Sequence, residues 1–159
     1  MDDIKNKLVE RGFSGELDDS AEALEFYSHD ASMFELIPKL VIKPKTSQDV
    51  QTAVKLVADE KQNNPELSLT ARSAGTDMSG AAINDSIIVD FNAHLTEVIS
   101  IKEDLATVQP GMLFRDFDVF FWRLFVELFN HSFFNCWCLC INDGCFDLCN
   151  GVLFRNIEA

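Results

Sequence analysis

Basic residues are scarce in this chain of 159 residues, which has 13 Lys and Arg against 26 Asp and Glu and a formal net charge of −13 at pH 7. A surface this acidic repels a phosphate backbone, so we expect no nucleic-acid partner. The chain also lacks a run of about 18 uncharged apolar residues, because Arg123 and Glu127 interrupt the apolar stretch 120–129, and we expect no transmembrane span. No basic segment followed by an apolar one marks a signal peptide at the N-terminus, so a cytoplasmic protein is predicted.

Several ligand-binding motifs are also missing. The five cysteines form no C-x-x-C pair and the three histidines no H-E-x-x-H motif, so no metal site is predicted. Gly75 and Gly80 have the spacing of the glycines in a P-loop, but Ala81 and Ala82 stand in place of its lysine and hydroxyl residue, which excludes a nucleoside triphosphatase. The pattern G-x-G-x-x-G does not occur, so we expect no nicotinamide-binding Rossmann site.

The chain does contain 47% apolar and 25% charged residues, a composition that can bury the core of a globular domain. This composition changes near residue 115. All five cysteines and nine of the fourteen phenylalanines follow that point, and no lysine does. We therefore divide the sequence into an N-terminal helical segment (1–35), a domain (36–115) and an atypical Phe- and Cys-rich tail (116–159). The tail is interpreted as an out-of-frame or truncated end of the coding sequence.

Apolar periodicity predicts an α+β fold. Helices are expected at residues 2–11, 20–27 and 46–62, and strands at residues 40–42, 67–71, 86–91, 95–101 and 106–109. The third helix has the clearest signals, because Thr46 can cap it with Asp49 three residues later. An apolar stripe on this helix is predicted to be buried, formed by Val50, Ala53, Val54 and Val57. The order strand, helix, strand predicts a right-handed parallel crossover.

A segment rich in small residues follows the second of these strands. It reads Arg72-Ser73-Ala74-Gly75-Thr76-Asp77-Met78-Ser79-Gly80. Open α/β sheets bind ligands at the carboxyl ends of parallel strands, where this segment begins. Gly75 and Gly80 allow positive φ and close backbone approach, so successive N–H groups can surround phosphate oxygens, with the Thr76 and Ser79 hydroxyls as further donors. We interpret the segment as a diphosphate-binding loop, and a loop that only turns the chain is the alternative that these residues leave open.

Five short motifs follow one another along the chain. They are Leu-Val-Ile-Lys-Pro at 40–44, Thr-Ser-Gln-Asp-Val at 46–50, Arg-Ser-Ala-Gly-Thr at 72–76, Ile-Val-Asp at 88–90 and Val-Gln-Pro-Gly at 108–111. The series resembles the N-terminal part of the FAD-linked oxidases, flavoproteins with an FAD-binding domain of the p-cresol methylhydroxylase and vanillyl-alcohol oxidase type. Their D-lactate dehydrogenase and glycolate oxidase branch is the most similar. The resemblance implies a small parallel β-α-β sheet flanked by helices and the start of a second β subdomain, and it makes residues 36–115 an incomplete FAD-binding domain.

The resemblance also implies where FAD binds. The diphosphate would lie on the backbone of residues 73–77, and the rest of the loop and the start of the second subdomain would complete the site. The implied cofactor-binding residues are Pro44, Arg72, Ser73, Ala74, Gly75, Thr76, Asp77, Met78, Ser79, Gly80, Val108, Gln109, Pro110 and Gly111. Relatives with covalently bound FAD carry a histidine where Thr76 stands, so a non-covalent flavin is implied.

For function, the resemblance implies a flavin-dependent oxidoreductase whose full-length relatives oxidise a small 2-hydroxy acid such as D-lactate or glycolate. The segments that would hold the flavin ring and the substrate have no counterpart in residues 116–159, so no catalytic residue is assigned. The isolated chain is therefore expected to be inactive. The alternative, from another class, is a catalytically silent remnant or interaction module that keeps the scaffold without flavin.

Overall fold

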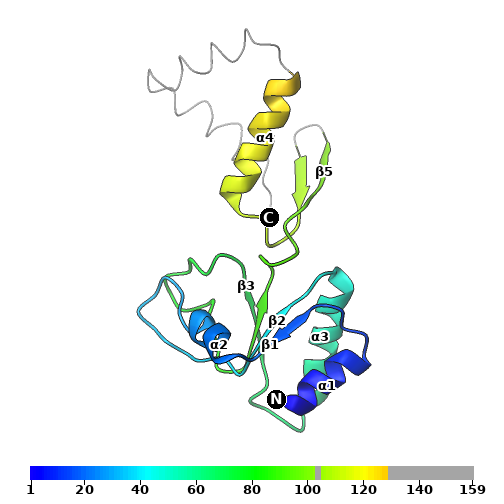
Figure 1. The fold of residues 1–159 in the computed structure, drawn as a ribbon, viewed down its shortest axis with the longest axis vertical. Coiled ribbons are helices and arrows are strands. Elements are labelled where there is room, and N and C mark those ends of the chain that lie inside the picture. The colour runs from blue at the N-terminus through cyan, green and yellow to red at the C-terminus, as the bar shows by residue number, and fades with distance from the viewer. Residues whose placement is uncertain (103–104, 129–159) are drawn as a thin grey trace. The chain divides into compact units, whose positions relative to one another are not determined.

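The structure, a computed structural model, describes residues 1–102 and 105–128. The chain divides into two compact units, Met1–Thr96 and Glu97–Ala159 (Figure 1). The five cysteines and most of the predicted atypical tail fall in residues 129–159, outside the described residues. Each unit is therefore considered by itself.

The first unit is built on a four-stranded sheet with the strand order β1-β2-β4-β3. The strands are β1 (Glu16–Asp18), β2 (Leu40–Lys43), β3 (Leu69–Arg72) and β4 (Ile87–Asp90). β2 and β3 both run parallel to β4, whereas β1 pairs with β2 in the antiparallel direction. The three strands expected in this region are confirmed within two residues at each end. β1 has no expected counterpart, because three largely polar residues give no alternating apolar pattern.

The position of β4 refines the predicted crossover. Helix α3 (Ser47–Glu60) connects β2 to β3 as predicted, yet these two parallel strands are not neighbours. β4 lies between them, and Ile87 is the register partner of both Leu40 and Leu69. The carboxyl ends of the three parallel strands consequently meet at one edge of the sheet. The connection from β3 to β4, residues 73–86, begins at that edge.

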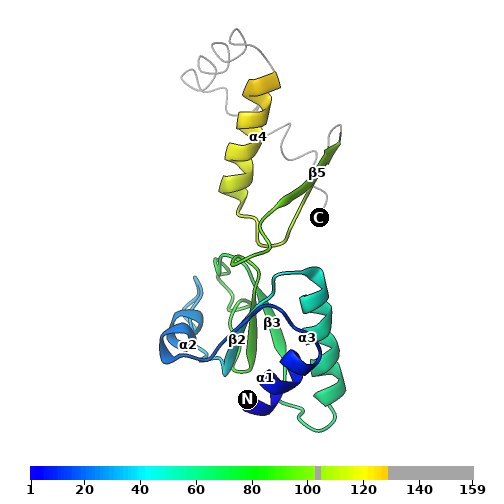
Figure 2. The same cartoon turned by 45° about the vertical axis from the view of Figure 1, so that its right-hand side comes forward.

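Helices cover both faces of the sheet, as the nearly continuous apolar strands β2 and β4 require. The helices of this unit are α1 (Asp2–Glu10), α2 (Ala21–Tyr27) and α3. α1 and α3 pack on one face, where Leu40 and Ile42 of β2 belong to the main core (Figure 2). α2 lies on the other face, where Tyr27 packs with Val41 and Ile88. Alternate residues of β2 thus contribute to different cores, as the pleat of a strand dictates.

Helix α3 begins as the sequence predicts. Thr46 accepts a hydrogen bond from the N–H of Asp49 through its hydroxyl, and the Asp49 carboxylate accepts one from the N–H of Thr46, which completes a capping box. Of the expected buried stripe only Ala53 is buried, whereas Val50 and Val57 are half-buried and Val54 is 53% exposed. The side chains that are buried are Asp49, Thr52, Ala53 and Leu56. These have the same helical spacing, so the side of the helix that faces the core is the one that carries the capping carboxylate and Leu56.

Asp49 is buried and joins α3 to the segment before β1, because its carboxylate accepts hydrogen bonds from the backbone N–H and the hydroxyl of Ser14. We expect Asp49→Ala to reduce the free energy of unfolding by about 2 kcal/mol at pH 7, since it leaves several partly buried N–H groups without their charged acceptor. The control is Asp59→Ala, which removes an exposed α3 carboxylate paired with Arg11. It should cost about 0.5 kcal/mol. Urea denaturation measures both values.

The same carboxylate predicts a pH dependence of stability. Burial raises the pKa of Asp49, but hydrogen bonds from Ser14 and Thr46 outweigh burial and leave the pKa below its ordinary value. Its stabilising contribution is therefore complete above the unfolded-chain pKa of about 4 and is lost as the pH falls through the lower, folded value. Asp49→Asn should flatten this loss of stability in acid. Equal acid sensitivity in the wild type and the variant would contradict the assignment.

The second unit contains the antiparallel strands β5 (Val98–Lys102) and β6 (Leu105–Val108), followed by helix α4 (Phe114–Leu128). The two strands correspond to the pair expected from the sequence. α4 runs through residue 115, where the composition of the chain changes. Among the described residues, no helix is long and apolar enough to cross a membrane.

Candidate functional site

The predicted diphosphate loop begins at the edge where the parallel strands end. Arg72 is the last residue of β3, and Gly75 and Gly80 have positive φ values of 66° and 84°, as the prediction requires. A cavity of about 290 Å³ opens where the loop starts, beside the end of β4 and helix α2. It is lined by Phe26, Tyr27, Arg72, Ser73, Ala74, Asp90, Asn92 and Ala93.

Arg72 is buried beneath the loop, with 7% of its surface exposed. Its Nη1 donates to the backbone carbonyl oxygens of His29 at 2.7 Å, Ala82 at 3.3 Å and Tyr27 at 3.4 Å. The guanidinium carbon lies 5.2 Å from the centre of the Tyr27 ring, close enough for a cation–π contact. These contacts join both ends of the loop to the residues around the end of α2.

Gly75 is the point where the loop passes closest to Arg72. A Cβ atom at this position would lie 2.5 Å from Nη2 of Arg72, so only glycine fits there without a shift. The carbonyl oxygen of Gly75 accepts a hydrogen bond from the N–H of Ala31 at 3.1 Å. A trans peptide group points its C=O and N–H in opposite directions, so the N–H of Thr76 is directed away from Ala31.

The backbone N–H groups of residues 74–77 make no hydrogen bond within the part of the chain that the structure describes. Successive donors of this kind beside a glycine with positive φ form a concavity that binds anions. Arg72 is the only lysine or arginine in the predicted loop and among the residues that line the cavity. Recognition of a negative charge here therefore depends on backbone donors and one guanidinium, an arrangement that fits a diphosphate group.

In the second half of the loop, the carboxylate of Asp77 accepts hydrogen bonds from residues that follow it. Oδ1 of Asp77 accepts hydrogen bonds from the N–H of Ser79 at 2.7 Å, the hydroxyl of Ser79 at 2.8 Å and the N–H of Ala81 at 3.0 Å. These bonds, led by the one from Ala81, hold the pKa of Asp77 below its ordinary value. The structure thus separates residues 74–77, whose N–H groups are unused, from Ser79 and Ala81, whose N–H groups already donate to Asp77.

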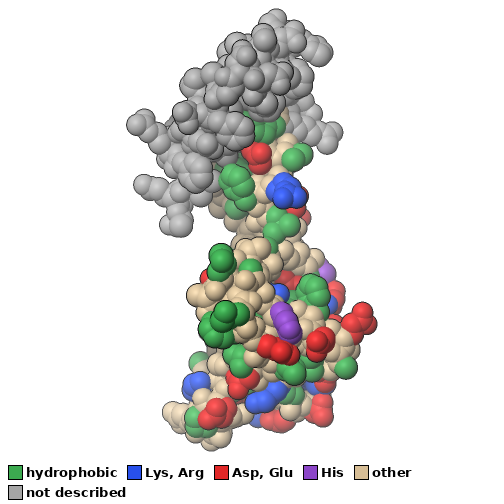
Figure 3. All heavy atoms as spheres, turned by 90° about the vertical axis from the view of Figure 1, so that its left-hand side faces the viewer, with side chains coloured by type: hydrophobic (Ala, Val, Ile, Leu, Met, Phe, Trp, Pro, Cys, Tyr) green, Lys and Arg blue, Asp and Glu red, His purple; other side chains and the backbone are tan. Residues whose placement is uncertain are grey.

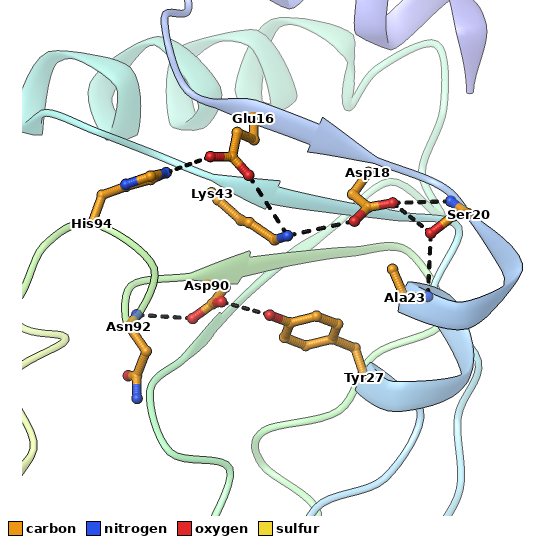
Figure 4. Close-up of polar contacts among 9 residues, drawn as sticks. All are labelled: Glu16, Asp18, Ser20, Ala23, Tyr27, Lys43, Asp90, Asn92 and His94. Atoms are coloured by element: carbon orange, nitrogen blue, oxygen red, sulfur yellow. Dashed lines mark hydrogen bonds and ion pairs between the residues drawn. The ribbon is translucent and has the colours of Figure 1, made fainter.

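A polar cluster lines part of the cavity, and Figure 4 shows most of its contacts. The hydroxyl of Tyr27 donates to Oδ2 of Asp90 at 2.5 Å, and Oδ1 of Asp90 accepts a hydrogen bond from the N–H of Asn92 at 2.8 Å. The Ser73 hydroxyl donates to the side-chain oxygen of Asn92 at 2.7 Å and so connects the cluster to the loop. Burial, followed by the hydrogen bond to Asp90, raises the pKa of Tyr27, so its hydroxyl remains a neutral donor.

Tyr27, Asp90 and Asn92 are site residues that sequence reasoning misses. Tyr27 and Asp90 are 63 residues apart, so no local pattern relates them. The available signals are that Tyr27 is the only tyrosine and that Asp90 ends the motif at 88–90.

His94 connects the segment after β4 to β1, because its Nε2 lies 2.8 Å from Oε1 of Glu16 (Figure 4).

Apolar side chains are exposed in and near the loop. The exposed fraction is 91% for Met33, 82% for Met78 and 69% for Phe26. Figure 3 shows apolar side chains beside acidic ones on the face of the first unit that carries α2. Phe34 lies next to the loop, since a Cβ atom added to Gly80 would come within 3.1 Å of its ring. The surroundings of the loop offer apolar contacts rather than basic side chains.

The other predicted site residues are Pro44 and the segment 108–111. Pro44 follows β2, but its side chain is fully buried and does not line the cavity. In the second unit, the N–H of Met112 donates to the carbonyl oxygen of Gln109, which closes the predicted turn around Pro110 and Gly111. The turn is confirmed, whereas a role in cofactor binding for these residues stays a prediction.

Part of the chain matches a known family and several curated proteins. The FAD binding domain family matches residues 38–123, more than half of the chain. The D-2-hydroxyglutarate dehydrogenase of Escherichia coli K12 is 32% identical over 109 residues, which cover 67% of this chain and 10% of that protein. The D-2-hydroxyglutarate dehydrogenase of Haemophilus influenzae is 35% identical over 89 residues, which cover 53% of this chain and 8% of that protein. The chain spans about a tenth of the length of these relatives.

Solved structures agree with the chain in fold. Alkyldihydroxyacetonephosphate synthase gives a TM-score of 0.66 at 14% identity, over 78% of this chain and 25% of that one. p-Cresol methylhydroxylase with bound substrate gives 0.62 at 20% identity, over 77% of this chain and 24% of that one. The expected α+β fold of the p-cresol methylhydroxylase type is therefore confirmed. The chain belongs to the FAD binding domain family of the FAD-linked oxidases, and it corresponds to the N-terminal part of these proteins.

Proposed function

We propose that the first half of the loop binds the diphosphate of FAD. The observation that carries this proposal is the run of backbone N–H groups at residues 74–77 without partners among the described residues. Diphosphate oxygens would accept hydrogen bonds from these donors. Gly75 supports the proposal, because its missing Cβ lets the loop lie directly on the guanidinium of Arg72, which adds a positive charge beneath the anion.

Neighbouring residues are proposed to complete the cofactor site. The hydroxyl of Thr76 and the backbone of Ser73 would add donors at the loop. The cavity beside Ala74 would receive the part of the dinucleotide next to the diphosphate. We also keep Pro44 and Val108–Gly111 as proposed contacts, on the strength of the family resemblance. Arg72 would act mainly by holding the loop, since its Nη1 is engaged by three carbonyl groups.

We infer that the flavin is held without a covalent bond. Thr76 stands where relatives with covalent FAD carry a histidine, and its hydroxyl offers no imidazole nitrogen to join the flavin ring. Acid precipitation of protein loaded with FAD should therefore release all of the yellow colour into the supernatant. Colour that stays in the pellet after washing in denaturant would overturn this inference.

In full-length relatives, we propose, this domain serves the oxidation of a small 2-hydroxy acid in the cytoplasm. The curated relatives named above are D-2-hydroxyglutarate dehydrogenases, which supports that substrate class. Bound flavin supplies the acceptor for the hydride of such a substrate. The proposed domain of residues 36–115 contributes the phosphate end of the site. No described residue is assigned to the substrate, and we assign no dehydrogenase activity to the chain by itself.

A second candidate function is a silent remnant or interaction module that binds no flavin. The observation in its favour is that apolar side chains in and near the loop, those of Phe26, Met33 and Met78, are exposed, as a surface that contacts a partner would be. Titration of FAD with the purified chain, followed by flavin fluorescence, separates the two functions. A saturable change at a one-to-one ratio supports FAD binding. Fluorescence equal to that of free FAD at every ratio supports the module.

A further inference from the structure

Asp77 lies at the boundary between the two halves of the loop. Its own N–H is the last of the unused donors, while its side chain accepts the N–H groups of Ser79 and Ala81. An anion bound to residues 74–77 would therefore lie close to the carboxylate of Asp77, which already accepts the hydrogen bonds of the second half of the loop. Like charges at such close range repel each other.

We propose that Asp77 positions the diphosphate loop through its side-chain oxygen and at the same time lowers the affinity for the diphosphate through its negative charge. This inference rests on the proposed binding of FAD to residues 74–77. Asp77 is thus a positioning residue and a determinant of affinity, and its side chain is not a ligand of the phosphate groups. The two effects have opposite signs and depend on different properties of one side chain, so substitutions can separate them.

The contacts of Asp77 show which substitution separates the effects. All three hydrogen bonds end on Oδ1, and none of them reaches Oδ2. An asparagine can place its side-chain oxygen at Oδ1 and direct its amino group outward, since Asp77 is only half-buried. Asp77→Asn therefore keeps the acceptor and removes the charge. Asp77→Ala removes both and leaves the N–H groups of Ser79 and Ala81 without their acceptor.

The charge is present in the neutral pH range, because the hydrogen bonds to the carboxylate keep the pKa of Asp77 below its ordinary value. A repulsion between exposed charges weakens as salt screens it. The proposal therefore predicts a salt-dependent difference between wild type and Asp77→Asn, and a difference between wild type and Asp77→Ala that remains at high salt.

FAD titrations of the full chain test these expectations. Asp77→Asn should bind FAD about 2- to 5-fold more tightly than wild type at low ionic strength, and the difference should shrink in about 0.5 M salt. Asp77→Ala should bind about 10-fold more weakly, because the loop loses its internal support. Asp85→Asn is the matched control, since it changes the net charge equally at an exposed residue before β4, which begins at the opposite edge of the sheet. It should leave the affinity unchanged.

Amide hydrogen exchange gives a second readout that needs no ligand. The amides of Ser79 and Ala81 should exchange slowly in wild type and Asp77→Asn and faster in Asp77→Ala. If Asp77→Asn binds FAD no more tightly than wild type, or if Asp77→Ala leaves exchange at these amides unchanged, the inference is overturned while FAD binding by the wild type stands. A wild-type chain that binds no FAD overturns the proposed function and this inference together.

Discussion

Gly75→Ala should lower the affinity of the chain for FAD by about 100-fold or more, which corresponds to about 2.7 kcal/mol. Two physical effects combine at this position. A φ of 66° strains any residue with a Cβ atom, at a cost of about 1–2 kcal/mol. The added Cβ would also lie 2.5 Å from Nη2 of Arg72, so the loop or the guanidinium must move. Either movement displaces the N–H groups of residues 74–77 from the positions in which they face one anion.

Gly12→Ala is the matched control for this variant. Gly12 has a φ of 83° and therefore imposes the same kind of strain, but nothing lies within 4 Å of a Cβ atom built there. We expect Gly12→Ala to lose the free energy of unfolding that the strain alone costs and Gly75→Ala to lose at least as much in urea, with only Gly75→Ala losing FAD binding in titration calorimetry. Equal FAD affinities of the two variants would argue against the loop as the diphosphate site.

Arg72→Lys should reduce the free energy of unfolding by about 3 kcal/mol and remove most of the affinity for FAD, even though it keeps the positive charge. A lysine has one nitrogen on a flexible stem and no planar group. All three carbonyl groups, those of Tyr27, His29 and Ala82, accept from one guanidinium nitrogen, Nη1, and the lysine side chain is one bond too short to place its ammonium nitrogen there. Lysine also loses the contact of a planar guanidinium with the Tyr27 ring. The carbonyl groups left unpaired are costly, and the loop loses the support that joins its two ends.

The lysine variant also distinguishes two roles for Arg72. If the residue served FAD only as a positive charge, lysine would keep the affinity within about threefold of wild type. Arg11→Lys is the matched control, because Arg11 is a partly exposed arginine that pairs with Asp59. It should change neither stability nor FAD affinity by more than the error of measurement. Wild-type affinity in Arg72→Lys would contradict the positioning role.

Local sequence signals predict the features that local interactions determine. The capping box of Thr46 and Asp49 lies within one turn of helix, and both partners can be recognised from their spacing. Gly75 and Gly80 have positive φ, as expected of glycines in a tight loop. Strand β2 forms at the apolar run that predicts it. The order of the five short motifs predicts the type of fold, because five motifs rarely occur in one particular order by chance.

Features that depend on distant residues are not visible in the sequence. No local pattern shows that β4 enters the sheet between β2 and β3. None shows that Tyr27 donates to Asp90, which lies 63 residues later in the sequence. Val54 fits the apolar periodicity, yet it is exposed, because the side of the helix that faces the core carries Asp49 and Leu56 instead. The side chain of Asp77 closes half of the loop, a contact that competes with the interpretation of the whole segment as free donors.

The central claim, that residues 74–77 bind the diphosphate of FAD, is tested most directly by recording the backbone amide resonances of the ¹⁵N-labelled chain during titration with FAD. We predict that the amides of residues 74–77 shift until one equivalent is bound, and that those of Ser79 and Ala81, which donate to Asp77, move much less. Riboflavin, which lacks the diphosphate, should leave the amides of residues 74–77 unchanged. Binding of FAD without shifts at residues 74–77, or equal shifts with riboflavin, would contradict the claim.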